Sequence, residues 1–441
     1  MNYLFQLTQA EKQRQKNTLN LIASENYPSP KVLQLLGEIW STKYGEGYPH
    51  KRYYAGNQNT DLLEEFVQQK ALQVFDPTGT YGVNVQTLSG SPANQTVFLT
   101  ILQPNDIVLS PQLASGGHLT HMHTVSSFSK FFRPHQYTAK PNPDGSFEID
   151  FATLKEQIAN LKPKLVILGF SAYPKQYSFG EICRFAHEQG SFVLADVAHI
   201  NGLIAAGLHD SPFKEGDDGA DFVSMTTHKT IRGPRAAMLF AKNYIPQFAE
   251  KYLDTLPKDA MGKPVNSLIE AINRSLFPGG YGGPHFNKIA AIGQCLLEVL
   301  GEDVYPDGID FVTYCKNVLR TNKKLELALQ AGGLEPVTPT ENHLCLIKLP
   351  PEVDSLKIQQ ELDEIGIVSN RNTFPNDTKP AYRPGGMRFG TAALTSRGLT
   401  EQQAELLGQI ITDLVFRRKP KEVLIRQVQE VVASLRWWYE F

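Results

Sequence analysis

The chain has 441 residues, enough for about two to three domains and a sizeable apolar core. Lysine and arginine number 43 and aspartate and glutamate 45, so the net charge of −2 provides no long-range field for a polyanion, and nucleic acid is not expected as the main partner. Hydrophobic residues make up 41% of the chain and charged residues 20%, which is typical of an ordinary globular protein and excludes a disordered or fibrous one.

The cysteines and the N-terminal segment bear on the compartment. Cys183, Cys295, Cys315 and Cys345 are spaced like neither a zinc site nor a dense disulfide framework. Residues 1–16 lack the apolar core of a signal peptide, and no later apolar run approaches the roughly 18 residues that span a bilayer. We therefore expect a soluble, cytoplasmic protein with no membrane partner.

The first amphipathic helix is predicted to follow Ser29, a favoured N-cap, with Pro30 as its first residue. Apolar side chains then recur at helical spacing, at Val32, Leu35 and Leu36, and at Ile39. The loop at 43–56 comes next, and it has too many glycines, prolines and charges for a buried element and too many aromatics for an idle linker. It is either a functional loop or a tyrosine-rich packing loop.

Short apolar runs alternate with helical segments from about residue 60 to 245. The runs that predict buried strands are 107–109, 165–168, 192–195, 222–225 and 236–240. A helix between the second and third runs carries Ile182, Phe185 and Ala186 on one face and stops at Gly190. This order favours right-handed parallel crossovers, and hence an open α/β sheet.

The pattern of predicted elements changes near residue 275. A breaker-rich segment at 278–284 is a hinge candidate, and long helices are predicted at 289–300 and 311–331. An apolar run at 344–348 and a helical C-terminus follow. We predict a smaller α/β domain here.

An anion site is predicted at Ser89-Gly90-Ser91. This turn precedes the apolar run 97–102, so Ser91 is expected as the N-cap and Pro92 as the first helical residue. Free backbone N–H groups and the helix dipole would then face the turn. Without a Gly-Lys-Ser/Thr or a G-x-G-x-x-G motif, a lone phosphate fits better than a nucleotide, although a plain capped helix has the same pattern.

Polar residues follow three of the predicted strands, at the edge where open α/β sheets bind ligands. Asp196 and His199 follow the strand at 192–195, Ser171 follows the preceding strand, and Lys229 lies on a tight polar turn after the strand at 222–225. Taken singly, Asp196 could instead cap the next helix, and Lys229 could instead lie on a solvated turn. With the phosphate site they suggest pyridoxal phosphate, with Asp196 for the pyridine nitrogen and Lys229 for the Schiff base.

Two further motifs bear on ligands. His118, His121 and His123 have no nearby carboxylate and match no familiar metal signature, so no metal is expected. Arg388 lies in a glycine-framed turn at 385–391, which suits a fixed guanidinium that holds a carboxylate, or else a surface arginine in a loop.

At these residues the sequence resembles the serine hydroxymethyltransferases, which are pyridoxal-phosphate enzymes of fold type I, from residue 21 to the C-terminal helices. The motifs that carry the resemblance lie at 21–26, 44–49, 51–54, 89–91, 116–121, 171–173, 226–235 and 277–284. The resemblance implies a large domain with a mostly parallel seven-stranded sheet and a smaller C-terminal α/β domain. The expected division is an N-terminal arm at 1–40, the large pyridoxal-phosphate domain at 41–274 and the small domain at 275–441.

The resemblance also implies roles around the cofactor. Lys229 would hold it as an internal aldimine, Asp196 would bond the pyridine nitrogen, and His118 would stack on the ring. His199 and Ser171 would lie at the ring hydroxyl. The phosphate would be held by Ser89, Gly90, Ser91 and His228.

Substrate residues follow from the same resemblance. Ser24 and Arg388 would hold the substrate carboxylate, with Arg235 and Tyr54 nearby, and Leu119 and Asn372 match positions of the folate pocket. Glu46 is the candidate for proton transfer. A homodimer with shared sites is implied, in which the partner supplies Tyr44, Glu46, Tyr54, Gly282 and Gly283.

The implied activity is the reversible conversion of serine and tetrahydrofolate into glycine and 5,10-methylenetetrahydrofolate, through an aldimine and a quinonoid. One alternative is a folate-independent aldolase acting on threonine-like β-hydroxy amino acids. Another is a catalytically idle relative that binds RNA or protein, against which the joint presence of Lys229, Asp196, Glu46 and Arg388 argues. The chain departs from the usual family pattern at His50, Tyr281 and Ala392 and over 122–135.

Overall fold

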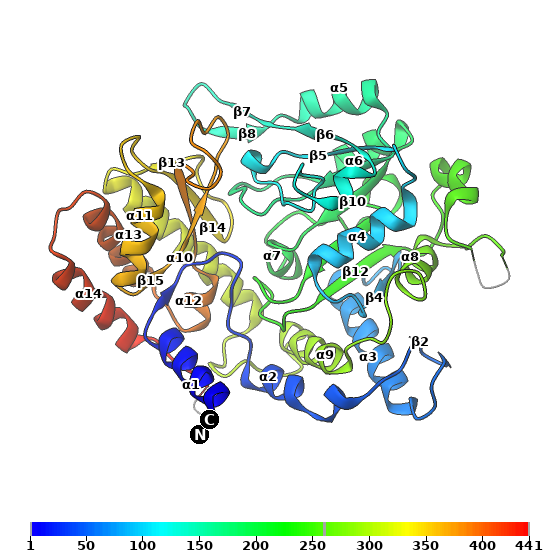
Figure 1. Cartoon of the computed structure of the whole chain (residues 1–441), viewed down its shortest axis with the longest axis horizontal. Helices are drawn as coiled ribbons and strands as arrows, with labels where there is room; N and C mark the ends of the chain where they lie inside the picture. The colour runs from blue at the N-terminus through cyan, green and yellow to red at the C-terminus, as the bar shows by residue number, and fades with distance from the viewer. Residues whose placement is uncertain (1, 259–261, 440–441) are drawn as a thin grey trace.

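A seven-stranded sheet forms the centre of the larger of two lobes in the computed structural model, which describes residues 2–258 and 262–439 (Figure 1). In spatial order its strands are β4 (Tyr81–Asn84), β12 (Ala237–Lys242), β11 (Phe222–Thr226), β10 (Phe192–Asp196), β9 (Leu165–Leu168), β5 (Ile107–Pro111) and β6 (Arg133–Tyr137). Neighbours are parallel except that β12 is antiparallel to both β11 and β4. The mostly parallel, seven-stranded sheet is therefore confirmed. The turn between β11 and β12 is too short for a parallel crossover, which explains the one antiparallel strand.

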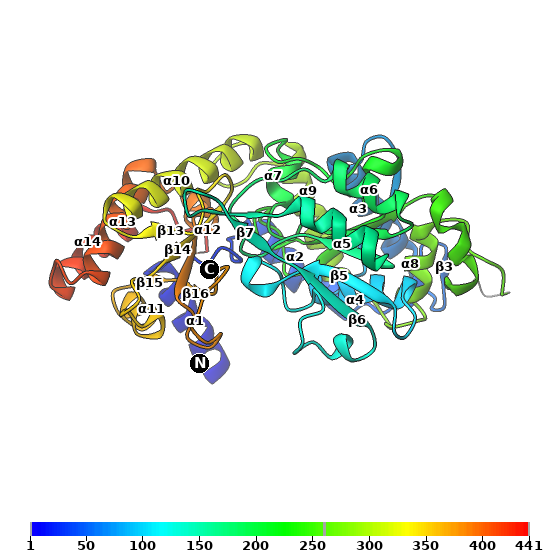
Figure 2. The ribbon, with the colours of Figure 1, turned by 90° about the horizontal axis from the view of Figure 1, so that it is seen from above.

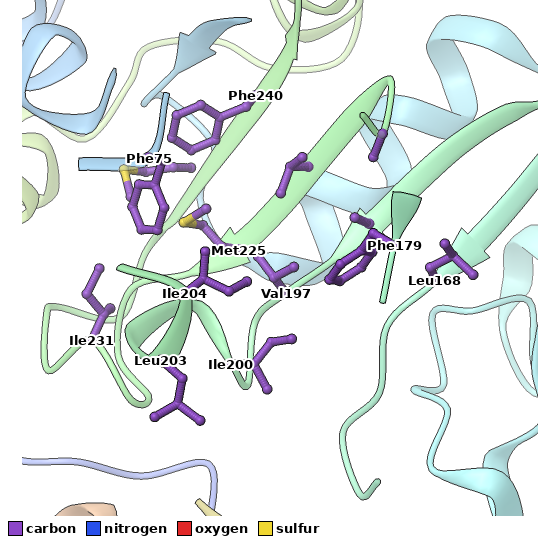
Figure 3. Close-up of a cluster of buried hydrophobic side chains, with 14 of the residues drawn as sticks. Phe75, Leu168, Phe179, Val197, Ile200, Leu203, Ile204, Met225, Ile231 and Phe240 are labelled. Carbon is purple, nitrogen blue, oxygen red and sulfur yellow. The ribbon is translucent and has the colours of Figure 1, made fainter. Parts of the chain in front are cut away.

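Helices cover both faces of this sheet, which explains why its central strands are apolar throughout. The helices of the larger lobe are α2 (Pro30–Gly37), α3 (Gln58–Phe75), α4 (Gly90–Ile101), α5 (Phe151–Leu161), α6 (Gly180–Glu188), α7 (Asn201–Ala205), α8 (Leu268–Leu276) and α9 (Phe286–Leu300). On one face, Phe75, Leu203, Met225 and Phe240 belong to a single buried cluster (Figure 3). On the other, α4 and α8 pack through a second cluster.

Short elements complete the larger lobe. Its two-stranded ribbons are β2 (Gly47–Tyr48) with β3 (Lys51–Arg52), and β7 (Ala139–Pro141) with β8 (Phe147–Ile149). Its 3-10 helices are Ile39–Thr42, Leu113–Ser115, Ser127–Lys130, Gly216–Asp218 and Gln247–Thr255.

Three predicted helix boundaries need correction, and one of them is the start of α9, which lies at Phe286 and not at 289. Helix α4 begins at Gly90 with Ser89 at the capping position, so the prediction of Ser91 as N-cap is wrong. Ser89 is extended and its carbonyl already accepts the N–H of Ala93, at 3.0 Å. Pro92 is tolerated in the first turn because its missing N–H needs no helical partner there.

Helix α2 begins at Pro30 as predicted, and the Ser29 hydroxyl accepts the N–H of Val32 at 3.3 Å. It ends at Gly37, so Ile39 leaves the apolar face and is 73% exposed.

The smaller lobe holds a four-stranded antiparallel sheet. Its strands, in spatial order, are β13 (Glu335–Pro336), β14 (Leu344–Lys348), β17 (Gly386–Gly390) and β16 (Asn370–Asn372). Its helices are α10 (Phe311–Ala331), α11 (Ser355–Glu364), α12 (Ala392–Ser396), α13 (Glu401–Val415) and α14 (Lys421–Ser434). Both the helix predicted at 311–331 and the strand predicted at 344–348 are found. Figure 2 shows the two lobes side by side.

Packing crosses the predicted domain limits. Phe286 and Ile292 of α9, and Tyr314 near the start of α10, join the core of the larger lobe. Leu19 and Leu21 join the core of the smaller lobe. The division at residues 40 and 274 stays a prediction, and its three parts include residues outside the described ranges.

The N-terminal segment runs from the smaller lobe to the larger one (Figure 1). After α1 (Tyr3–Lys16), β1 (Leu19–Asn20) pairs in parallel with β15 (Ile367–Val368) of the smaller lobe. The side-chain nitrogen of Asn26 then donates to the carbonyl of Lys229, at 2.7 Å. Across the described part of the chain, no helix is long and apolar enough to cross a membrane.

Candidate active site

A cavity of about 350 Å³ lies at the carboxyl ends of β9, β10 and β11, where the smaller lobe faces the sheet. This is the edge at which open α/β sheets bind ligands. Of the residues singled out from the sequence, the structure places twelve in its lining: Ser24, Ser89, Gly90, Ser91, His118, Ser171, Asp196, His199, His228, Lys229, Arg235 and Arg388.

Lys229 lies on the turn between β11 and β12, and it is buried. The turn is closed by a hydrogen bond from the Gly233 N–H to the Thr227 carbonyl, at 2.6 Å. Burial lowers the pKa of Lys229 to about 8; Arg388 and Arg235 also lower it, while Asp196 opposes the shift. A large fraction of this amine is therefore neutral and nucleophilic near pH 8.

Arg232 stabilises the turn that carries Lys229. Its φ of 65° is left-handed, and its backbone N–H donates to the Lys229 carbonyl at 3.1 Å. Its guanidinium carbon lies 3.9 Å from the ring centroids of both Tyr305 and Tyr314. This cation–π sandwich stabilises the strained backbone that presents Lys229.

Asp196 ends β10 and stays ionised. Its Oδ2 accepts from Asn94 Nδ2 and from His121 Nε2, each at 2.9 Å, and its Oδ1 accepts the Ala198 N–H at 3.1 Å. Burial alone would raise the pKa of Asp196. The hydrogen bonds from His121 and Asn94, together with the neighbouring histidines, outweigh burial, and the net effect is a pKa below the usual value. The carboxylate is thus ready to stabilise a protonated ring nitrogen.

Backbone N–H donors determine which ring nitrogen of His121 and of His118 carries a proton. The His118 N–H donates to Nδ1 of His121 at 3.1 Å, so the ring proton of His121 is on Nε2, facing Asp196. The Thr120 N–H donates to Nδ1 of His118 at 3.2 Å. Burial and the neighbouring His121 lower the pKa of His118 to about 4, so its half-buried ring is neutral.

An anion cradle lies at the start of α4. Ser89, Gly90 and Ser91 offer hydroxyls and the free N–H groups of a helix N-terminus. A Cβ on Gly90 would come within 2.7 Å of Cγ2 of Thr226, so only glycine lets the helix approach β11 this closely. His228 lies at the same cavity, and burial with the nearby Lys229 lowers its pKa to about 3.

Arg388 reaches the cavity from β17 of the smaller lobe. Its Nε donates to Asn370 Oδ1 at 3.1 Å and its Nη1 to the Ser171 carbonyl at 2.6 Å, which fixes the plane of the guanidinium. No described residue bonds Nη2. Burial lowers the pKa of Arg388 to about 10, so it remains charged at neutral pH. Ser24, half-buried, and Arg235, exposed, complete this side.

A second cavity of about 300 Å³ adjoins the first and shares His118 and Ser171 with it. Its lining includes Leu119 and Asn372, the two residues predicted to bind folate. Their role stays a prediction, but both lie beside the first cavity.

The remaining predicted residues gather elsewhere, and none lines the first cavity. The Tyr44 hydroxyl donates to Glu46 Oε1 at 2.8 Å, and the rings of Tyr44 and Tyr54 lie 5.0 Å apart. A Cβ on Gly283 would come within 2.7 Å of the Tyr44 ring, and one on Gly282 within 3.3 Å of Glu46 Oε1. The structure therefore brings these five residues to one another but not to Lys229 of the same chain.

Sequence analysis missed Asn94 and His343, and it considered His121 only as a metal ligand and not as the partner of Asp196. Asn94 follows Ser91 by three residues, and His121 follows His118 by three, so helical and turn spacing could have drawn attention to both. His343 lies against His199. Nothing near His343 in the sequence indicates that contact, because it joins segments of the two lobes.

The residues present fit pyridoxal phosphate, because an anion cradle and an ionised carboxylate flank a buried amine at the edge of a mostly parallel sheet. Fold and site together define a pyridoxal-phosphate-dependent enzyme of fold type I.

Comparison with known proteins is specific. The family model described as serine hydroxymethyltransferase matches residues 2–411, and the chain belongs to this family. The serine hydroxymethyltransferase of Caenorhabditis elegans is 40% identical over 416 residues, which cover 92% of this chain and 77% of that protein. Those of Desulfotalea psychrophila and Sorangium cellulosum are 38% and 37% identical, each over 98% of this chain and 92% of the relative.

Proposed function

We propose that this chain catalyses the reversible transfer of the hydroxymethyl group of serine to tetrahydrofolate, giving glycine and 5,10-methylenetetrahydrofolate. The observation that carries the proposal is the convergence of Lys229, Asp196 and Arg388 on one cavity, from three separate strands or turns. Membership of the serine hydroxymethyltransferase family supports it.

Pyridoxal phosphate is held at both ends. Ser89, Gly90, Ser91 and His228 would bind the phosphate, and Lys229, with its lowered pKa, would hold the cofactor covalently. Asp196 would hold a proton on the pyridine nitrogen. When bound, the cofactor supplies an electron sink for the charge that develops at Cα as the hydroxymethyl carbon leaves. His118 would cover the ring, and His199 and Ser171 would lie at its hydroxyl.

Arg388 and Ser24 bind the substrate carboxylate. Because Nε and Nη1 of Arg388 are already anchored to Asn370 and Ser171, the guanidinium is oriented before substrate arrives. Such preorganisation lowers the entropic cost of holding the carboxylate. Arg235 and the partner's copy of Tyr54 line the same end.

Glu46 moves the proton at the hydroxyl oxygen of serine, acting from the second subunit of a homodimer. The support is its separation from the cavity of its own chain, together with its companions Tyr44, Tyr54, Gly282 and Gly283. The hydrogen bond from Tyr44 orients the carboxylate. Tetrahydrofolate occupies the adjoining cavity with Leu119 and Asn372.

A cytoplasmic location is part of the proposal. It is supported by the cysteines, because Cys183, Cys295, Cys315 and Cys345 are all buried and unpaired.

The test is an absorption spectrum of the purified protein with glycine, before and after addition of tetrahydrofolate, together with serine turnover in the presence and absence of tetrahydrofolate. We expect a spectral change on addition of folate and folate-dependent serine turnover. Serine or threonine-like cleavage that is indifferent to folate would support the aldolase instead.

A further inference from the structure

A second buried histidine lies behind His199, on the side away from the cavity. Nε2 of His343 is 3.2 Å from Nδ1 of His199, and the ring centroids are 5.4 Å apart. His343 has no exposed surface and does not line the cavity, whereas His199 does. The contact joins the loop before β14 of the smaller lobe to the end of β10 in the larger one.

The backbone around His343 is clamped onto the larger lobe. The Glu341 N–H donates to the Pro174 carbonyl at 2.8 Å, and the Asn342 side chain donates to the Tyr173 carbonyl at 2.9 Å. Asn322 of α10 donates to the Asn342 carbonyl at 3.0 Å from the other side. The ring of His343 is therefore held against His199 in a defined position.

Both rings are neutral. Burial, together with the charges of Lys229 and Arg388, lowers the pKa of His199 well below its usual value. Burial and the same two cations lower the pKa of His343 to about 3. Two neutral imidazoles that share one hydrogen bond have one proton between them, so one ring donates and the other accepts.

The unpartnered nitrogen of His343 decides which ring donates. Its Nδ1 is buried, and no described residue bonds it. A proton on Nδ1 would leave a buried N–H without an acceptor, which native structures rarely tolerate. The proton is therefore on Nε2 and is donated to Nδ1 of His199. His199 must then be protonated on Nε2, which no described residue bonds, while its ring lines the cavity.

We infer that His343 is a positioning residue, which fixes the tautomer of His199 so that its Nε2–H is a hydrogen-bond donor for an oxygen of the ligand in the cavity. The inference rests on the proposed function only for the identity of that ligand, because the tautomer is a property of the chain alone.

The test uses the cofactor-free protein with ¹⁵N-labelled histidine at pH 7.5, and the nitrogen shifts of His199 are assigned with His199→Asn. We expect a protonated Nε2 and an unprotonated Nδ1. In His343→Gln the amide still donates to Nδ1, so the tautomer persists. In His343→Leu the donor is lost and Nδ1 of His199 becomes at least partly protonated. His209→Leu, which removes another buried ring near this seam, leaves the tautomer unchanged.

A second readout is the dissociation constant for pyridoxal phosphate. Loss of a hydrogen bond to a charged acceptor should weaken binding about tenfold or more in His343→Leu, and far less in His343→Gln. A wild-type His199 protonated on Nδ1, or a tautomer unaltered by His343→Leu, would overturn the inference. If His343→Leu does not fold, the wild-type and His343→Gln spectra still decide it. Absence of serine turnover beside the expected tautomer would refute the proposed function and leave this inference intact.

Discussion

Nε2 of His121 lies 2.9 Å from Oδ2 of Asp196, and the backbone N–H of His118 occupies the opposite nitrogen of the same ring. The tautomer of His121 is thus fixed by the main chain. Asp196 is held ionised in a buried place by hydrogen bonds from this ring, from the Asn94 side chain and from the Ala198 N–H.

The first prediction concerns this pair. His121→Ala should raise the pKa of Asp196, because burial then acts with less opposition. The lowered pKa in the folded wild type provides stability that is present above the ordinary pKa and is lost as pH falls through the folded value. The variant should therefore begin acid unfolding at a higher pH and lose about 1.5–3 kcal/mol at neutral pH. The measurement is acid unfolding of the cofactor-free protein. His123→Ala is the control, and equal midpoints for the wild type and His121→Ala would contradict the role of His121.

Lys229 should carry the cofactor. Its pKa of about 8 predicts that the rate of covalent attachment rises with pH up to about 8 and then levels off, as the neutral amine becomes dominant. Borohydride reduction followed by peptide mapping should label Lys229 in the wild type and no other lysine. Lys229→Arg should lack the label. A label on Lys175 or Lys51 would defeat the assignment.

Substitutions of two asparagines on β16 should affect the binding of different substrates. Asn370 holds Nε of Arg388, whereas Asn372 lines the adjoining cavity. Asn370→Ala should weaken glycine binding and largely spare tetrahydrofolate, and Asn372→Ala should do the reverse. Titrations of each ligand, followed by cofactor absorbance, measure both constants, with each variant as the control for the other. Parallel losses in both variants would indicate only a disturbed strand.

Arg388→Lys should weaken the binding of serine and glycine although the charge is kept. Lysine has no planar guanidinium group that Asn370 and Ser171 could hold in place. We expect a loss of about one to two decades in glycine affinity, corresponding to roughly 1.5–3 kcal/mol. Pyridoxal phosphate affinity should barely change, since the phosphate is held at α4. Unchanged glycine affinity, or loss of the cofactor itself, would refute the assignment.

Shared sites predict complementation between inactive variants. Glu46→Gln and Lys229→Ala should each be inactive, yet a mixture that exchanges subunits should recover about a quarter of wild-type activity, because half the dimers are mixed and each has one intact site. Gel filtration and mass spectrometry establish exchange, and Lys229→Ala mixed with Lys229→Arg is the control. Demonstrated exchange without recovery would count against a site built from two chains.

The fold could be predicted where local patterns are strong. The helix at 311–331 and the strand at 344–348 were predicted with their observed limits, because periodicity and flanking breakers are local signals. The start of α4 could not be predicted, because Ser89 and Ser91 are equally good caps in the sequence, and only the structure shows that Ser89 is extended and that its carbonyl accepts the N–H of Ala93.

The site also has a part that the sequence predicts and a part that it does not. Lys229, Asp196 and the turn at 89–91 follow strands or precede a helix, so sheet topology alone brings them together. The partners of Asp196 and the contact of His343 with His199 depend on packing between segments far apart in the chain, for which one sequence has no signal.

The crossing of the N-terminal segment between the lobes has a mechanical consequence. The Leu21 carbonyl accepts the N–H of Gly390 in the smaller lobe, and five residues later Asn26 is bonded to the Lys229 carbonyl in the larger one. Ser24 lies on the short span between these two anchors. Any rotation of one lobe against the other must therefore stretch or bend this span, so the segment acts as a tether that limits opening and moves Ser24 whenever the lobes move. Slower hydrogen exchange at the Gly390 amide on glycine binding would record the release of strain in this tether, at a distance from the ligand.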